Sequence, residues 1–333
     1  MKVLKCKDLE EEILSDLTTR VQKLKEKGVF PALAMISVGN DPASETYVTK
    51  KEKTAKRLGI QTFQVNLPKD MSEDDLLKTV IYYSYRYPTI VQLPLPSPEL
   101  TDRVIKVLSS ATDVDGFTSL NVGRMMAGEQ CFIPATPKGI LAILRKFNIP
   151  TEGKNVAVVG RSNIVGRPLA NLLSSKEYNA TVTLCHSHTQ KLSSILKQMD
   201  IVIVATGKPA TVNVYDLKPD AVVIDVGVNR VPDNSERGWH LEGDFDKTGV
   251  ENTDISYTPV PGGGWSCTLK SRYSTTYVTG LCTDRNCPSG KQRAFENALN
   301  KLYEYEVYAL GSRVVFYEKL IKQYDYYKKI SKV

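Results

Sequence analysis

The sequence of 333 residues predicts an α/β fold, with an N-terminal α/β domain followed by a Rossmann-like, doubly wound domain. Two observations lead to this prediction. Helical and strand patterns alternate through the first 263 residues, as they do when helices cover a parallel sheet. A second series of elements begins after Pro134, and one of its strands runs into a glycine-containing turn that opens a helix. We therefore place the domains at residues 1–133 and 134–263, with residues 264–333 as a separate tail.

The first series of elements begins with a helix. Apolar residues recur at helical spacing from Leu9 to Leu24, and Gly28 provides a stop, so we expect a helix over residues 9–27. The Ser-Glu-Asp-Asp run at residues 72–75 is similar to a capping box and predicts a further helix up to about residue 85. The other elements expected in this series are strands at 32–38, 61–66 and 90–93 and a helix at 44–58.

The second series has the order of a nucleotide-binding domain. We expect helices at 138–147, 168–174 and 191–198, and strands at 155–159, 180–185, 201–204 and 221–226. This order of elements is typical of a doubly wound parallel sheet. The tail differs, because it shows a long helical pattern from about Ser289 that is interrupted at Gly311.

The composition excludes several classes of protein. Hydrophobic residues make up 41% of the chain and charged residues 24%, as in a typical soluble globular protein. The apolar runs are far shorter than the roughly 20 residues that cross a bilayer, which argues against a membrane protein. The N-terminal region lacks the apolar run of a secretory signal, and the six cysteines show no regular spacing. We therefore expect reduced thiols and a cytoplasmic location.

The net charge of +7 does not indicate a nucleic-acid partner. Residues 264–333 hold twelve basic and six acidic residues, which leaves a net charge of only +1 for residues 1–263. Nine of the 17 tyrosines also lie in this tail. A basic, tyrosine-rich pattern of this kind is more typical of a solvated helix than of a nucleic-acid-binding surface.

The turn after residues 155–159 is the most informative motif. A strand ends at Gly160, and Gly166 and Pro168 open the following helix. This geometry directs backbone N–H groups and the positive end of a helix at an anion, as in dinucleotide-binding domains. Ser162 replaces the middle glycine of the usual G-x-G-x-x-G pattern. The glycine spacing alone therefore fits an ordinary strand–turn–helix equally well.

The next strand favours NADP over NAD as the cofactor. An NAD-binding domain usually carries an acidic residue at the end of this strand, where it binds the ribose 2′-hydroxyl. Here the strand is followed by His186, Ser187 and His188, without a carboxylate, and Arg161 lies in the preceding glycine turn. Arginine and hydroxyl donors suit a 2′-phosphate. No cysteine or carboxylate cluster completes a ligand set around the two histidines, so we expect no metal.

The N-terminal half contains a candidate proton-transfer group. Tyr47 and Lys51 lie four residues apart on one helical face. A lysine that is partly desolvated in a cleft can have its pKa lowered and can then transfer a proton near neutral pH. A solvated surface lysine is the ordinary alternative. Gln92 at an apolar strand end, and Asp113 and Asp115 in a tight loop, are each typical of turn structure when taken alone.

Together, these segments occur in the order and spacing of one enzyme family over residues 1–263. The sequence resembles the bifunctional methylenetetrahydrofolate dehydrogenase/cyclohydrolase family. The motifs that carry the resemblance are Val38–Ser44, Tyr47-x-x-x-Lys51, Val91–Pro96, Asp113–Gly116, Thr136–Gly139, Gly160–Pro168, Cys185–Ser187 and Thr258–Gly263.

The resemblance implies a concrete function. The protein would oxidise 5,10-methylenetetrahydrofolate with NADP and hydrolyse the methenyl product to 10-formyltetrahydrofolate, acting as a homodimer with a cleft between its domains. The catalytic residues would be Lys51, Gln92 and Asp115. The folate would also contact Tyr47, Pro261, Gly262 and Gly263. The resemblance places NADP against Gly160, Arg161, Ser162, Ile164, Val165, Gly166, His186, Ser187, Thr206 and Gly207.

The resemblance ends after Gly263. The family continues with a Val-Gly-Pro-Met-Thr stretch, whereas this chain reads Gly-Trp-Ser-Cys-Thr at residues 264–268. A shifted reading frame or a genuine extension would explain the change. Two alternatives therefore stay open beside the bifunctional enzyme, namely an inactive or weakened folate- or nucleotide-binding paralogue and a monofunctional NAD-dependent dehydrogenase. Cys282 and Cys287 lack a second ligand pair, which argues against a zinc site in the tail.

Overall fold

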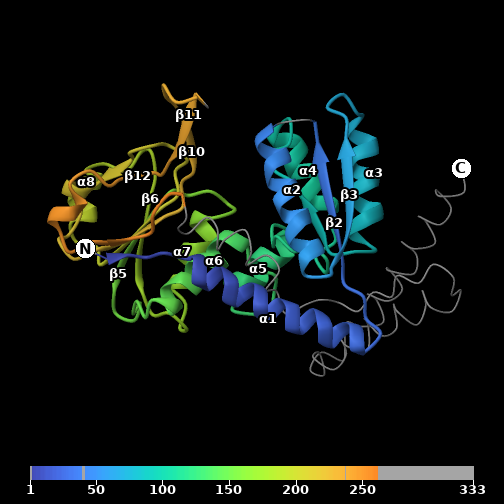
Figure 1. Ribbon diagram of the computed structural model, residues 1–333, viewed down its shortest axis with the longest axis horizontal. Helices are drawn as coiled ribbons and strands as arrows, with labels where there is room; N and C mark the ends of the chain where they lie inside the picture. Colours follow the sequence, from blue (N-terminus) through green and yellow to red (C-terminus); the bar gives the residue numbers. More distant parts are fainter. Residues whose placement is uncertain (1, 40–41, 237, 262–333) are drawn as a thin grey trace, which may run out of the picture. The chain divides into compact units, whose positions relative to one another are not determined.

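The computed structural model describes residues 2–39, 42–236 and 238–261, without the side chains of residues 42–48 and 50. The tail and its expected helix, the Cys282–Cys287 pair, Gly262, Gly263 and the Tyr47 side chain lie outside what it describes. The α/β fold class is confirmed, since two parallel sheets with helices on their faces account for most of the described chain (Figure 1).

The first sheet has three parallel strands in the order β3-β2-β4. The strands are β2 (Ala32–Val38), β3 (Gln61–Leu67) and β4 (Thr89–Val91). On one face, Leu33 and Met35 of β2 pack with residues of α1 (Lys7–Glu26) and α2 (Pro42–Arg57). On the other face, Ile36 packs with residues of α3 (Glu73–Ser84) and α4 (Pro98–Val107). The alternation of side chains along β2 thus buries both of its faces, as expected for a central parallel strand.

The second sheet has six parallel strands in the order β1-β13-β9-β7-β5-β6. Its central strands are β5 (Asn155–Val159), β6 (Thr181–Cys185), β7 (Ile201–Val204) and β9 (Val222–Asp225). One face packs with residues of α6 (Ala135–Lys146) and α7 (Gly166–Leu173), and the other with Leu196 of α8 (Leu192–Leu196). The chain moves from β5 outward to β6 and then crosses to β7 on the other side of β5. This reversal is the topological switch point at which doubly wound sheets bind ligands.

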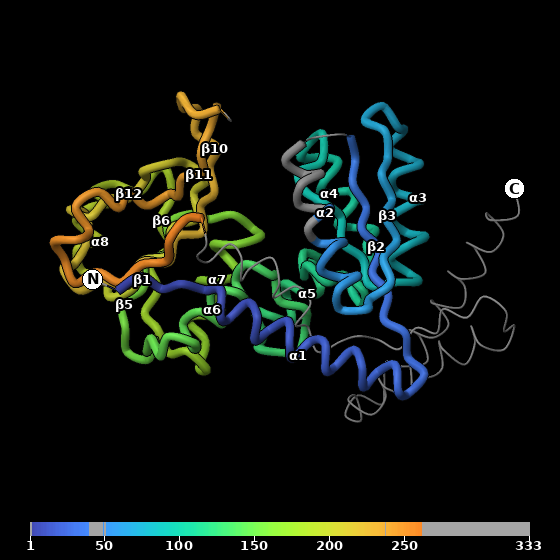
Figure 2. The backbone as a smooth tube through the Cα atoms, viewed as in Figure 1, coloured from blue at the N-terminus to red at the C-terminus, as the bar shows by residue number. Residues whose placement is uncertain are grey.

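The edge of the second sheet is built from the start of the chain, which the sequence patterns did not indicate. Strand β1 (Lys2–Val3) pairs in parallel with β13 (Ser256–Tyr257), so that Lys2 lies opposite Ser256. The tube in Figure 2 shows this blue segment beside the orange end of the described chain. The N–H of Leu4 donates to the carbonyl of Tyr257 at 2.8 Å. Two residues of the N-terminal segment thus complete a sheet of the following domain.

Three helices begin earlier than their sequence patterns predict, and each has a proline in its first turn. The helix expected from residue 44 begins at Pro42, the one expected from residue 138 begins at Ala135, and the one expected from residue 168 begins at Gly166. The first-turn N–H groups of a helix have no partner within the helix, so Pro42, Pro137 and Pro168 cost no hydrogen bond there. Proline marks the first turn of each helix rather than its boundary.

Several elements were not predicted. These are α4, α5 (Ser119–Ala127), the short helices η1 (Val214–Asp216) and η2 (Val250–Asn252), the parallel pair β8 (Val212–Asn213) and β12 (Phe245–Asp246), and the hairpin of β10 (Asn229–Pro232) with β11 (Trp239–Glu242). Helix α4 carried a local signal, because the Ser97 side chain accepts a hydrogen bond from the Leu100 N–H at 3.1 Å and Pro98 follows it.

Candidate functional site

Lys51 and Gln92 form a direct contact at the carboxyl end of the first sheet. Lys51 lies on α2 and is only 4% exposed, and its Nζ donates to Gln92 Oε1 at 2.6 Å. Gln92 follows β4, and its backbone N–H donates to the Ile36 carbonyl at 2.8 Å. Its Nε2 donates to the Leu93 carbonyl at 2.7 Å, which fixes the amide with its oxygen toward the lysine. The result is a buried amine held by a short, oriented hydrogen bond.

The loop that carries Asp115 is anchored beside β4. Asp113 forms a parallel bridge with Thr89 of β4, and its Oδ2 accepts from the Thr118 N–H at 2.8 Å and from Asn121 Nδ2 at 3.0 Å. Burial raises the pKa of the Asp113 carboxyl, while these hydrogen bonds oppose the shift. Asp115 itself is 3% exposed. Asp113 therefore connects the loop both to β4 and to the start of α5, and Asp115 is the second carboxylate of this loop.

The glycine turn lies at the switch point of the second sheet. The N–H of Gly160 donates to the Cys185 carbonyl at 2.9 Å, which joins the ends of β5 and β6. A Cβ on Gly160 would collide with the carbonyl of Ala205 after β7, and a Cβ on Gly166 would collide with the carbonyl of Gly160. Both glycines are therefore required for the backbone segments to cross this closely.

Ser162 explains why the middle glycine of the usual pattern is dispensable here. Its hydroxyl oxygen accepts a hydrogen bond from the Val165 N–H at 3.1 Å, just ahead of α7. The side chain thus caps backbone N–H groups before the helix, which a glycine could not do. Arg161, Ser162 and Ile164 are all exposed, so this turn is accessible to a ligand from solvent.

The end of β6 carries histidines rather than a carboxylate. The N–H of His186 donates to Thr189 Oγ1 at 2.8 Å, and the N–H of His188 donates to His186 Nδ1 at 3.2 Å. Desolvation, followed by the positive charges of Arg161 and His188, lowers the pKa of His186. Arg161 and His186 follow β5 and β6, which pair in parallel with Val159 opposite Cys185. Arg161, His186 and Ser187 therefore belong to adjoining strand ends.

Thr206 and Gly207 follow β7 and complete this edge of the sheet. The Ala205 N–H donates to the Val159 carbonyl at 2.8 Å, which places the loop next to the glycine turn. The N–H groups of Thr206 and Gly207 donate to Asp244 Oδ2 at 2.6 and 2.8 Å. The structure thus brings together the segments of all the predicted cofactor residues, from Gly160 to Gly166, at His186 and Ser187, and at Thr206 and Gly207.

Two buried carboxylates at this edge were missed by the sequence analysis. Asp225, at the end of β9, is 2% exposed, and Asp244, before β12, is fully buried. Burial raises the pKa of Asp225 to about 6, although three backbone N–H groups donate to its carboxylate. The available signal was an aspartate that directly follows an apolar strand and is followed in turn by Gly227.

Pro261 is the one residue of the predicted folate-contacting turn that the structure describes. It is exposed and follows a cis Val260–Pro261 peptide bond. The roles predicted for Tyr47, Gly262 and Gly263 stay predictions, because the Tyr47 side chain and both glycines lie outside the described residues. Within the described part of the chain, no group of three or more histidine, cysteine, aspartate or glutamate side chains could hold a metal ion.

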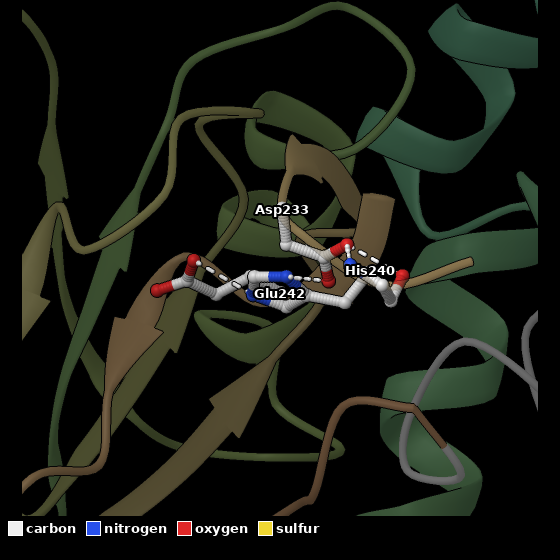
Figure 3. A network of polar contacts seen from close by, with 4 residues as sticks. Asp233, His240 and Glu242 are labelled. Atoms are coloured by element: carbon white, nitrogen blue, oxygen red, sulfur yellow. Dashed lines mark hydrogen bonds and ion pairs between the residues drawn. The ribbon is translucent and has the colours of Figure 1, made fainter. Parts of the chain in front are cut away.

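A second polar cluster lies on the β10–β11 hairpin (Figure 3). His240 Nδ1 lies 2.9 Å from Asp233 Oδ2, and Ser235 Oγ donates to Asp233 Oδ1 at 2.5 Å. His240 Nε2 lies 3.8 Å from Glu242 Oε2. The histidine side chain is 51% exposed, so the cluster is a surface arrangement that joins the two strands of the hairpin.

The comparisons with known proteins cover both sheets. Residues 4–115 match the family model described as tetrahydrofolate dehydrogenase/cyclohydrolase, catalytic domain. Residues 134–277 match the corresponding NAD(P)-binding domain model. The chain is 45% identical over 264 residues to the bifunctional protein FolD of Oceanobacillus iheyensis, an alignment that covers 78% of this chain and 90% of that protein.

Two solved structures are similar over nearly their whole length. One is the bifunctional FolD methylenetetrahydrofolate dehydrogenase/cyclohydrolase from Campylobacter jejuni, at 33% identity and a TM-score of 0.75, covering 90% of this chain and 99% of that one. The other is the dehydrogenase–cyclohydrolase from Trypanosoma brucei complexed with NADP cofactor and inhibitor, at 30% identity and a TM-score of 0.77, covering 89% and 98%.

Proposed function

Because the chain belongs to the tetrahydrofolate dehydrogenase/cyclohydrolase family, we propose that it oxidises 5,10-methylenetetrahydrofolate with NADP and hydrolyses the product to 10-formyltetrahydrofolate. The two activities, their place in one-carbon metabolism and the NAD(P)-binding domain follow from membership of this family. The choice of NADP and the roles of individual residues are our proposal. The observation that carries it is the buried Lys51–Gln92 hydrogen bond, because the family activity needs a proton-transfer group.

The cyclohydrolase step is assigned to Lys51. As water adds to the methenyl carbon and its second proton is released with formation of the formyl group, one proton must move from the added water to the ring nitrogen so that the C–N bond can open. The Lys51 amine accepts and returns this proton, since it is the buried basic group that the described contacts orient on this sheet edge. Gln92 holds the amine in place through its carbonyl oxygen, and Asp115 binds the pterin ring.

The dehydrogenase step is assigned to positioning by the second sheet. NADP, when bound, accepts a hydride from the methylene carbon. The residues present fit such a cofactor, because Gly160 and Gly166 let the backbone segments cross closely just ahead of α7, whose N-terminus would face the pyrophosphate. Arg161 lies in the turn after β5, the strand that pairs with β6, and no carboxylate stands at the end of β6. Both features support binding of the 2′-phosphate and hence NADP over NAD.

An absorbance assay with purified protein tests both steps. We expect reduction of NADP in the presence of 5,10-methylenetetrahydrofolate, with NAD much less effective. Lys51→Ala should abolish hydrolysis of the methenyl product while part of the hydride transfer persists. Lys56→Ala is the matched control, because Lys56 lies on the same helix and pairs with Glu52 at the surface.

The opposite result has a definite meaning. If the folded protein reduces neither NADP nor NAD, the activity has been lost with the sequence after Gly263, and the binding-paralogue alternative is correct. If NAD is reduced and hydrolysis is absent in the wild type, the monofunctional dehydrogenase alternative is correct.

A homodimer and a cytoplasmic location are further parts of this proposal and rest on the family resemblance and the composition. Among the described residues, no helix is long and apolar enough to cross a membrane. Light scattering of the purified protein tests the dimer, since a mass near twice that of the chain is expected. Fractionation of the source cells tests the location.

A further inference from the structure

The loop after β7 is held by a single carboxylate oxygen. Asp244 Oδ2 accepts from the backbone N–H groups of Thr206 and Gly207 at 2.6 and 2.8 Å and from the Thr206 hydroxyl at 3.0 Å. Three donors on one oxygen fix both the backbone and the side-chain rotamer of Thr206. A buried carboxylate that accepts several hydrogen bonds makes stronger interactions than a neutral acceptor would.

Asp244 is in turn fixed from two sides. Its Oδ1 accepts from Asn229 Nδ2 at 2.8 Å, and its backbone N–H donates to Asp225 Oδ1 at 3.0 Å. Asp225 also accepts from the N–H groups of Gly227 and Phe245, at 2.9 and 3.0 Å. The ends of β7 and β9 and the start of β12 are therefore connected through two buried carboxylates.

Two glycines make this arrangement possible. A Cβ on Gly227 would collide with the carboxylate of Asp244, and a Cβ on Gly243 would collide with the carboxylate of Asp225. Each aspartate thus occupies the space that a side chain would take on the opposite segment. Because each carboxylate lies against a glycine, it can take the one position in which its hydrogen bonds are made.

We propose that Asp244 is a positioning residue that sets the conformation of the Thr206–Gly207 loop for NADP binding. Asn229 and Asp225 fix the position of Asp244 through their hydrogen bonds to it. This inference rests on the proposed function, because it assigns the loop to the cofactor. Asp244 acts through the loop backbone, and its two oxygens are already taken by donors of the chain. It therefore affects cofactor binding rather than the chemistry on the folate.

The test measures NADPH binding by fluorescence together with the two activities. Asp244→Ala leaves the Thr206 and Gly207 N–H groups without their acceptor, and we expect the Kd for NADPH to rise about 10- to 100-fold. Hydrolysis of the methenyl substrate needs no cofactor, so its kcat and KM should stay within about twofold of wild type. Asp244→Asn keeps one oxygen for the loop but turns its amide nitrogen toward the Asn229 donor, so it should restore the binding in part.

The controls separate this role from a loss of fold. Asp246→Ala removes a carboxylate two residues away that accepts hydrogen bonds from the Thr248 N–H and hydroxyl, and it should leave the Kd unchanged. If Asp244→Ala does not fold, Asn229→Ala carries the test, because it frees Asp244 Oδ1 and should raise the Kd severalfold without changing hydrolysis.

Two results would overturn the inference about Asp244, and a third would contradict the proposed function. A wild-type Kd in folded Asp244→Ala, or in Asn229→Ala where that variant carries the test, overturns the inference. An equal loss of hydrolysis and NADPH binding also overturns it, because the aspartate would then be purely structural. Wild-type protein that fails to bind NADPH contradicts the proposed function instead.

Discussion

The carboxyl ends of the two sheets hold their polar side chains in different ways. At the first sheet, the side chain of Gln92 orients Lys51 through a hydrogen bond between two side chains. At the second, Asp225 and Asp244 are held mainly by backbone N–H groups, which have little freedom to move. A proton-transfer group must exchange partners during a reaction, whereas a cofactor-binding edge must keep its shape. The comparison teaches that a change in the first region should act mainly on proton transfer, whereas a change in the second should act on the shape of the backbone that receives the cofactor.

The largest expected effect is at the glycine crossing of the second sheet. Gly166→Ala places a Cβ against the carbonyl of Gly160, and backbone cannot yield as a flexible side chain can. We expect a loss of stability of about 3 kcal/mol or more and no NADPH binding. Thermal unfolding and fluorescence titration measure both. Gly123→Ala on α5 is the matched control, since a Cβ there meets nothing within 4 Å. An unchanged melting temperature in Gly166→Ala would break the comparison.

The next effect is a pH dependence of stability at Asp225. Burial raises the pKa of this carboxyl to about 6, above its ordinary value of 3.8, so the folded state takes up its proton more readily than the unfolded state. Its contribution to stability is full below pH about 4 and is lost as the pH rises through about 6, by up to roughly 3 kcal/mol.

Denaturant unfolding of wild type and Asp225→Asn at several pH values tests this sign. The free energy of unfolding of the wild type, relative to the variant, should fall between pH about 4 and 6. The difference isolates Asp225 from Asp200, Asp233 and Asp246, whose lowered pKa values act in the opposite direction. If this difference in free energy of unfolding rises with pH instead, the pKa of Asp225 is not raised in the folded state.

A smaller effect on stability, with a larger one on activity, is expected at Gln92. Gln92→Ala removes the carbonyl that accepts from Lys51 and should cost about 1–2 kcal/mol of stability. Hydrolysis of the methenyl substrate should fall about 10- to 100-fold, with NADPH binding unchanged. Parallel measurements of unfolding, hydrolysis and NADPH binding check these expectations. Equal losses of hydrolysis and NADPH binding would show that the two regions are not independent.

The smallest effect is expected on the hairpin. His240→Ala removes the ring that lies between Asp233 and Glu242, where the histidine is half-exposed. Exposed pairs of this kind contribute about 1 kcal/mol or less, so stability and both activities should be nearly unchanged. A large loss of activity would mean that His240 itself acts in the functional site, whereas the described link between the hairpin and that site is the contact of Asn229 with Asp244.

The sequence predicted the elements whose signals are local. Strands β2, β5 and β7 have the predicted bounds, because each is a short apolar run between turn residues. The glycine turn after β5 was likewise visible in the sequence, since both glycines lie within seven residues. Ser162 needed the structure, because only the fold shows that its hydroxyl caps the N–H of Val165.

The candidate site was less accessible from local patterns. Lys51 and Gln92 are 41 residues apart, and in the sequence the family resemblance, rather than any spacing, associates them. Asp225 and Asp244 were missed because their partners are backbone N–H groups up to 38 residues away. A backbone donor leaves no mark in the amino-acid sequence, so a carboxylate that depends on such donors is not distinguishable from a surface aspartate.

The pairing of β1 with β13 has a consequence for how the protein is made. Lys2 is synthesised 254 residues before its partner Ser256. The N-terminal strand therefore waits, without its strand partner, through translation of both sheets. The edge of the second sheet can close only after nearly all of the described chain has left the ribosome.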